Sequence, residues 1–105
     1  MRVRTHPGEV LKEDFLVPMG ISKGKLAEAI GVPVSVITDL VEQRLGIDAE
    51  MATRFSRYFG TSAEFWCNLQ AAYDLSVVAM TKEDELAGII PHRQAVEATR
   101  SVALP

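Results

Sequence analysis

The chain has 105 residues, of which 48% are hydrophobic, and a formal net charge of -3. The length and composition are those of one globular domain, and the negative charge excludes DNA binding through a general basic excess. The single cysteine, Cys67, excludes an internal disulfide, and two isolated histidines do not form a zinc-ligand cluster.

The first predicted helix spans residues 7–16. Pro7 suits the first helical position because that position needs no N–H donor, and Glu9 lies in the first turn, where negative charge is favourable. Val17 and Pro18 are expected to end this helix, since a residue before proline avoids helical dihedral angles. The helical spacing predicts a buried face made of Val10, Leu11, Phe15 and Leu16.

Two further helices are predicted over residues 23–30 and 33–43. Ser22 is a suitable N-cap for the first, and Gly31 can adopt the left-handed conformation that ends it. Pro33 suits the first position of the second helix. Leu26, Ala27 and Ile30 lie on one face of the first helix, and Val34, Ile37, Leu40 and Val41 supply the apolar helical spacing of the second.

A fourth helix is predicted over residues 49–59, after a loop at residues 44–47. Asp48 is its expected N-cap, and Gly60 its expected end. The inward face of this helix is predicted to hold Met51, Ala52, Phe55 and either Tyr58 or Phe59.

A fifth helix is predicted to begin at a capping box formed by Thr61 and Glu64 and to run to about Ala79. Its apolar positions are Phe65, Leu69, Ala72 and Tyr73. Residues 81–105 have weaker periodicity, which indicates a C-terminal tail with one short helix. We therefore expect an all-α, five-helix domain over residues 1–80, followed by this tail.

Residues 23–42 match the helix-turn-helix signature at four offsets. Ala27, Gly31, Ile37 and Leu40 occupy relative positions 5, 9, 15 and 18 of this segment. The two helices cross closely enough to require a small side chain at Ala27, Gly31 makes the turn, and the other two residues anchor the second helix to the core. With one helix before this pair and two after it, the predicted arrangement resembles the phage-repressor-like (lambda-repressor-like) DNA-binding bundle.

Residues 6 to about 78 resemble the HigA-type (VapI-like) antitoxins of the phage-repressor-like (XRE) helix-turn-helix superfamily. The stretches that carry the resemblance are His6-Pro7-Gly8-Glu9-Val10-Leu11, Phe15-Leu16, Leu26-Ala27, Gly31-Val32-Pro33, the Ile37 region, Phe59-Gly60-Thr61-Ser62, Phe65-Trp66 and Leu69-Gln70-Ala71-Ala72-Tyr73-Asp74-Leu75. The resemblance implies a homodimer that binds double-stranded operator DNA, represses its own operon and neutralises a small toxin that cleaves messenger RNA.

By position, the third predicted helix would enter the major groove with Val34, Ser35, Thr38 and Asp39 on its outward face. Serine and threonine hydroxyls can hydrogen-bond to bases or phosphates, and a valine can contact a thymine methyl group. Phosphate contacts are expected at the start of the second helix and after the third, from Ser22, Lys23, Lys25 and Arg44.

The expected reading surface departs from the family, which commonly has basic residues early in the third helix and an Asn-Gly-Lys-Arg run after it. This chain has Ser35-Val36 and Glu42-Gln43-Arg44-Leu45 at these places. Asp39 and Glu42 repel phosphates, although a carboxylate can also accept a hydrogen bond from cytosine N4.

The remaining conspicuous residues favour structural roles. Trp66 and Tyr73 are predicted to be core or dimer contacts, Cys67 a buried structural thiol, and His6 a helix-start residue. The sequence has no glycine-rich phosphate loop, paired catalytic carboxylates or metal-ligand spacing, so we expect neither an enzyme nor a cofactor. It also lacks a signal-peptide pattern and an apolar run of about 18 residues, so we expect a cytoplasmic protein without a membrane partner.

Two alternatives to the antitoxin hypothesis remain open. A stand-alone transcriptional regulator would use the same DNA chemistry without a toxin. A helix-turn-helix module that binds only proteins would show no salt-dependent DNA binding, and Ser35, Asp39, Glu42 and Leu45 motivate this second alternative. The toxin-binding surface is left open among residues 2–5, the flanks of the fifth helix and the tail.

Overall fold

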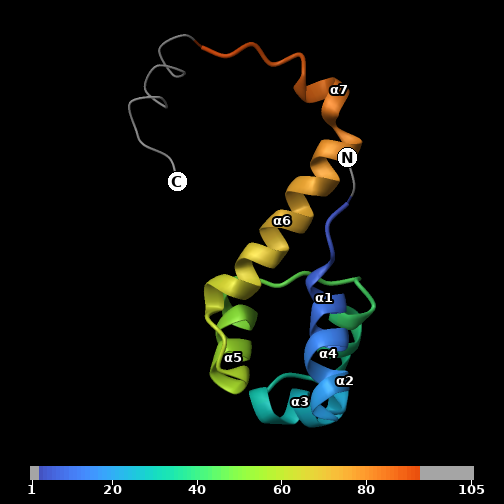
Figure 1. Ribbon diagram of the computed structural model, residues 1–105, viewed down its shortest axis with the longest axis vertical. Coiled ribbons are helices and arrows are strands. Elements are labelled where there is room, and N and C mark those ends of the chain that lie inside the picture. The colour runs from blue at the N-terminus through green and yellow to red at the C-terminus, as the bar shows by residue number, and fades with distance from the viewer. Residues whose placement is uncertain (1–2, 93–105) are drawn as a thin grey trace.

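The structure is a computed structural model that describes residues 3–92 (Figure 1). Its first helical segment is continuous and consists of α1 (Pro7–Val10), the π-helical turn η1 (Leu11–Leu16) and α2 (Val17–Met19). There follow α3 (Lys23–Ile30), α4 (Val34–Val41), α5 (Ala49–Phe59), α6 (Ala63–Thr81) and the short α7 (Glu83–Leu86). The segments up to α6 form the bundle, which confirms the predicted all-α, five-helix fold. Of the predicted tail, residues 81–105, the part after residue 92 lies outside the described residues, and the domain boundary at residues 80–81 stays a prediction.

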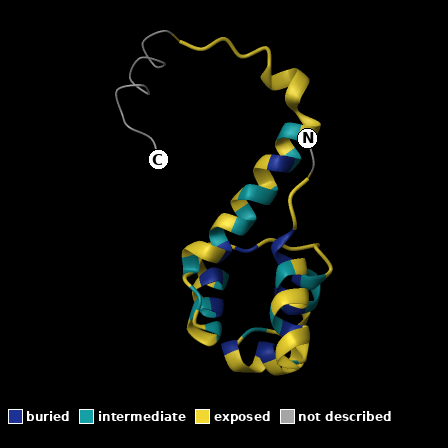
Figure 2. Cartoon of the chain, in the orientation of Figure 1, coloured by how far each residue is buried: buried dark blue, intermediate teal, exposed yellow. Residues whose placement is uncertain are grey.

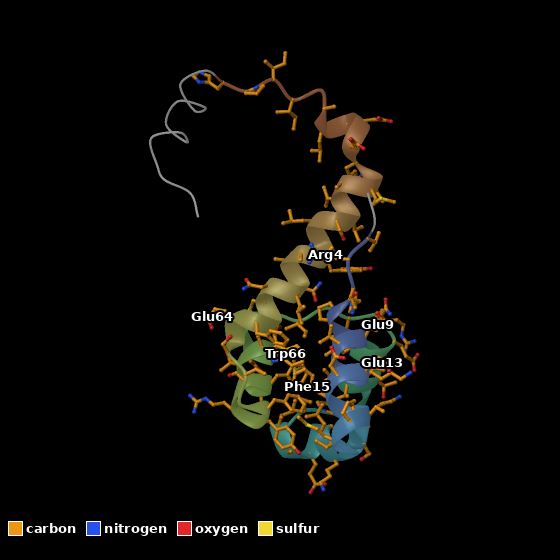
Figure 3. The ribbon with its side chains drawn as sticks, viewed as in Figure 1. Arg4, Glu9, Glu13, Phe15, Glu64 and Trp66 are labelled. Atoms are coloured by element: carbon orange, nitrogen blue, oxygen red, sulfur yellow. The ribbon has the colours of Figure 1, made fainter. Side chains whose placement is uncertain are left out.

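The core lies between the inward faces of the bundle helices, where buried residues gather (Figure 2). Trp66 of α6 is at its centre, with ring centroids of Phe55 and Phe15 at 4.9 Å and 5.1 Å. Phe15 and Trp66 point toward each other between the helices (Figure 3). Phe59, rather than Tyr58, packs against this core from α5. The other fully buried hydrophobic side chains are Leu11, Leu26, Ile37, Leu40 and Ala52.

The first helix does not end before Pro18, as the sequence predicted, but continues through it to Met19. The backbone N–H of Val17 bonds to the carbonyl of Lys12, five residues back, which is the π-helical pattern. In an α-helix the proline ring would contact the carbonyl four residues earlier, and the wider π-turn relieves this contact. Gly20, at a φ of 64°, ends the helix instead.

Two other helix starts differ from the sequence predictions. Pro33 is the N-cap of α4, with extended dihedral angles, rather than its first helical residue. The capping box at Thr61 and Glu64 is wrong, because Ser62 caps α6 by accepting a hydrogen bond from the N–H of Phe65. Thr61 has another role: its hydroxyl accepts the indole N–H of buried Trp66 at 2.7 Å. A buried indole needs such an acceptor.

The outer part of α6, α7 and the following residues project from the bundle, and we call residues 74–92 the distal segment (Figure 1). Extended residues 3–5 run beside the outer part of α6, where the backbone N–H of Arg4 bonds to the hydroxyl of Ser76 at 2.8 Å. Ser76 is the only buried residue of the distal segment. The large exposed hydrophobic side chains of the distal segment are Leu75, Val78, Met80, Leu86, Ile89 and Ile90.

Candidate nucleic-acid interface

Helices α3 and α4 form the helix-turn-helix that the sequence signature predicts. Gly31 has a φ of 75°, a left-handed conformation that a residue with a side chain rarely adopts. Ala27 is only 3% exposed where the two helices pack, and Ile37 and Leu40 have no exposed area. The inward side of α4 is therefore fixed by the core, and its opposite side is left for solvent or a ligand.

The start of α1 packs directly on the backbone of α4. A Cβ atom added to Gly8 would lie 1.8 Å from the carbonyl oxygen of Leu40, so this contact excludes every side chain. His6 stabilises the start of α1 as its N-cap, since its Nδ1 accepts the N–H of Gly8 at 2.9 Å. Burial lowers the pKa of His6, although the charge of Asp74 acts in the opposite direction. The helix-start interpretation of His6 is confirmed.

Arg54 of α5 holds the turn between the two helices of the helix-turn-helix. Its Nη1 donates to the carbonyl oxygen of Ile30 at 2.6 Å, at the C-terminal end of α3, where carbonyl groups lack helical partners. The same guanidinium is oriented by Glu50, one turn earlier on α5, at 3.0 Å. This contact was not predicted from the sequence, because Glu50 and Arg54 show there only an ordinary pair at helical spacing.

Gln70 of α6 holds the loop that follows α4. Its Oε1 accepts the backbone N–H of Ile47 at 2.7 Å, and its Nε2 donates to Asp74 at 2.9 Å. A Cβ on Gly46 would come within 3.0 Å of the Gln70 amide, so a glycine suits this position. Gly8 and Gln70 both lie in stretches that carry the family resemblance, which was the available signal for their roles.

The structure brings most of the predicted reading residues onto one side of α4. Val34 is 51% exposed and Ser35 is exposed, whereas Thr38 and Asp39 are partly exposed along the same helix. At the start of α3, Ser22 accepts the N–H of Lys25 at 3.1 Å as the N-cap. The side chains of Lys23 and Lys25 are exposed there. Cationic side chains thus flank a helix N-terminus, an arrangement suited to a phosphate group.

Arg44 is not a separate cation at the end of α4. Its Nη2 lies 2.8 Å from Oδ1 of Asp39, and its Nη1 hydrogen-bonds to Glu42. These hydrogen bonds to Asp39 and Glu42 raise the pKa of Arg44 above its ordinary value. The sequence predicted a phosphate clamp at Arg44 and repulsion of phosphates by the two acids, whereas in the structure the three side chains contact one another.

Comparisons with known proteins agree with this geometry. A scan against protein-family models found no match. Virulence-associated protein I of Dichelobacter nodosus is 46% identical over 78 residues, which are 74% of this chain and 72% of that protein. The structure of antitoxin GraA is 40% identical, with a TM-score of 0.82 over 88% of this chain and 98% of that chain. The Pseudomonas aeruginosa antitoxin HigA, solved with the higBA promoter, is 41% identical, with a TM-score of 0.81 over 86% and 98%. The chain belongs to the HigA-type antitoxin family.

Membership of the HigA-type family confirms the resemblance drawn from the sequence. Similar proteins are named as antitoxins, such as GraA and HigA, or as helix-turn-helix transcriptional regulators, such as YbaQ of Escherichia coli, rather than as enzymes, which agrees with the prediction of a binding protein. Among residues 3–92 no group of three or more His, Cys, Asp or Glu side chains could hold a metal ion. None of the described helices combines the length and apolar content of a membrane span.

Structural roles also account for the remaining conspicuous side chains of this HigA-type protein. Trp66 is a core residue, as one of its two predicted roles required. Cys67 is a free thiol that packs against the core but is only partly buried, rather than buried as predicted. The ring of Tyr73 lies edge-on to His6, with ring centroids 4.8 Å apart.

Proposed function

We propose that this protein is the antitoxin and self-repressor of a toxin–antitoxin pair, and that it binds its operator as a dimer through α4. The observation that carries the proposal is the exposed side of α4, presented by a helix-turn-helix whose inward side is locked in the core. Two similar proteins support it: antitoxin GraA has been solved with its operator, and Pseudomonas aeruginosa HigA with the higBA promoter.

Recognition would divide between base edges and phosphates. On α4, the hydroxyls of Ser35 and Thr38 would hydrogen-bond in the major groove, and Val34 would contact a thymine methyl group. Lys23 and Lys25 would contact phosphates beside the N-terminus of α3, which Ser22 caps. Phosphate contacts fix the register of the protein and base contacts supply sequence preference.

A dimer gives this interface the geometry that an operator requires. Two copies of α4 about 34–36 Å apart would enter successive major grooves on one side of the duplex. The operator would then be an inverted repeat that matches the two-fold axis of the dimer. Occupation of such a site in the promoter would repress the operon.

Toxin capture is assigned to a different surface. We place DNA binding at α3 and α4 of the bundle and toxin contacts mainly at the distal segment, which exposes Leu75, Ile89 and Ile90 and contains the acidic run of residues 83–85. An RNA-cleaving toxin needs a basic surface to bind RNA, and an acidic, apolar segment complements such a surface. The same negative charge disfavours contact with DNA.

Fluorescence anisotropy with the upstream DNA of the gene and a scrambled duplex, at two salt concentrations, tests DNA recognition. We expect selective binding, which Thr38→Ala relaxes and Lys23→Ala weakens equally for all sequences, reducing the log–log salt slope by about 0.9. Lys82→Ala, in the distal segment, is the matched control and should leave binding unchanged. No selective binding at low salt would contradict the repressor and favour the protein-interaction module.

Growth rescue in cells that express the neighbouring toxin gene tests toxin capture. We expect the double variant Leu75→Asp and Ile89→Asp to lose rescue while keeping operator binding, because both side chains lie outside the bundle. Met19→Asp, an exposed apolar position on the bundle, is the control and should keep rescue. Operator binding without a neighbouring toxin gene would instead favour a stand-alone regulator.

A further inference from the structure

The C-terminal end of α4 carries a cluster of three charged side chains, Asp39, Glu42 and Arg44. The guanidinium of Arg44 bonds to Oδ1 of Asp39 through Nη2 and to Glu42 through Nη1, so one cation bridges two carboxylates. The three side chains are 44–57% exposed, which places the cluster on the surface rather than in the core. We call it the Arg44 cluster.

The backbone explains how Arg44 reaches back over the helix that precedes it. Gln43 adopts a left-handed conformation, with a φ of 63°, and is the only described residue other than glycine to do so. The N–H of Arg44 then bonds to the carbonyl of Asp39 at 2.8 Å, and that of Gln43 to the carbonyl of Leu40 at 3.0 Å. These two bonds form a Schellman motif, which turns the chain back at the helix end. Asp39 and Arg44 are thus joined through both backbone and side chains.

The cluster lies on the helix that is proposed to read DNA, where charge has a large effect. Unpaired Asp39 and Glu42 would place two negative charges next to the phosphates. Arg44 reduces the formal charge of the cluster from -2 to -1 and directs its cation toward these acids. A phosphate clamp, by contrast, needs a cation that is available to the DNA backbone.

Pairing also fixes the carboxylate of Asp39 in one orientation. Arg44 occupies Oδ1, which leaves Oδ2 to accept a further hydrogen bond. In the major groove, the matching donor on a base is an exocyclic amino group, and a carboxylate pairs with N4 of cytosine. A fixed acceptor discriminates between bases better than a mobile one, because the cost of ordering it has been met before binding.

We propose that Arg44 shields and positions Asp39, so that Asp39 reads a cytosine amino group in the operator, and that Arg44 is not primarily a phosphate clamp. This inference rests on the proposed function, because it assumes that α4 enters the major groove. It assigns to an acidic residue the sequence preference that a basic residue commonly supplies. Arg44 is in this account a positioning residue that acts through Asp39.

The test measures binding of the full chain to operator duplexes in which each base pair is substituted in turn. We expect Asp39→Ala and Arg44→Ala to lose discrimination at the same C·G pair, by roughly tenfold to a hundredfold. Arg44→Lys should recover overall affinity but not this preference, because an ammonium group cannot hold two carboxylates in the planar geometry of a guanidinium. Lys23→Ala is the control and should weaken all duplexes equally.

Two results would overturn the inference. If Arg44→Ala weakens every duplex equally and reduces the salt slope by about 0.9, Arg44 is a phosphate clamp. If Asp39→Ala keeps the preference at every position, Asp39 does not read a base. Both results leave the proposed function intact. Failure of the unmodified chain to prefer its operator over scrambled DNA would contradict the proposed function as well as this inference. Circular dichroism should show unchanged folding of each variant, because exposed ion pairs contribute little to stability.

Discussion

The helix-turn-helix bundle and the distal segment bury their apolar residues very differently. In the bundle, seven hydrophobic side chains have no exposed area, and polar side chains such as Arg54 and Gln70 bond to the backbone of neighbouring elements. In the distal segment, Leu75 is 69% exposed and Ile90 is 88% exposed. The same chain thus combines a closed core with a projecting apolar surface.

The buried residues of the bundle stabilise the fold, whereas the exposed residues of the distal segment do not. Burial of the bundle side chains supplies the hydrophobic stabilisation of the monomer and holds α4 in place. The exposed residues of the distal segment contribute little to it, because they remain in contact with water. Their apolar character is better explained by a protein partner, as proposed above for the toxin.

Trp66→Ala is expected to have the largest effect on stability. Removal of the indole from the centre of the core should lower the free energy of unfolding by about 3–5 kcal/mol, measured by urea denaturation. Leu75→Ala, in the distal segment, is the matched control and should change it by less than about 0.5 kcal/mol. Similar losses for both variants would show that the distal segment belongs to the folded core.

Gly8→Ala is expected to disturb the contact between α1 and α4. The added Cβ would meet the carbonyl of Leu40 at 1.8 Å, so the helices must separate at a cost of about 1–3 kcal/mol or more. Gly24→Ala is a sharp control, since nothing lies within 4 Å of a Cβ at that position in α3. It should stabilise the protein by about 0.5–1 kcal/mol, because alanine favours helix. Equal effects of the two substitutions would contradict the close approach.

Acidification is expected to weaken the cap of α1. The pKa of His6 is lowered in the folded state. Neutral His6 therefore contributes fully to stability above the ordinary histidine pKa of about 6.5, and this contribution is lost as pH falls through the pKa of the folded state. Protonation of Nδ1 removes the acceptor for the N–H of Gly8, a cap worth about 1 kcal/mol. Urea denaturation between pH 7.5 and 5 measures the loss, and His6→Asn should reduce its pH dependence. An identical pH dependence in His6→Asn would exclude His6 as the cause.

Gln43→Gly is expected to have the smallest effect, and it is stabilising. Glycine adopts the left-handed conformation of residue 43 without steric cost, so thermal denaturation should show a gain of about 0.5–1 kcal/mol. Gln43→Ala keeps a Cβ and should not show this gain. A destabilised Gln43→Gly variant would mean that the glutamine side chain, rather than its backbone, holds the helix end.

Local signals in the sequence were sufficient to predict the helix-turn-helix. The small side chain of Ala27, the turn at Gly31 and the apolar spacing in α4 all report on neighbouring residues, and the structure has them as predicted. Caps were less predictable where two candidates adjoin. Ser62 and Thr61 both suit an N-cap, and the choice depended on the indole of Trp66, which engages Thr61.

The contacts that position the site depend on residues far apart in the sequence. Gly8 against Leu40 and Arg54 against Ile30 join different helices, and no periodic pattern marks either pair. The first helix likewise continues through Pro18 by means of a π-helical turn, which helix propensities do not indicate. The predicted DNA contacts stay predictions, because they concern a ligand outside the chain.

The most direct test of the central claim maps amide chemical shifts of the isotope-labelled protein by NMR during titration with an operator duplex. We predict the largest changes at residues 22–25 and at Val34, Ser35 and Thr38, with residues 74–92 unchanged and a scrambled duplex giving smaller changes. Changes confined to the distal segment, with α4 unperturbed, would contradict the assignment of DNA recognition to the bundle.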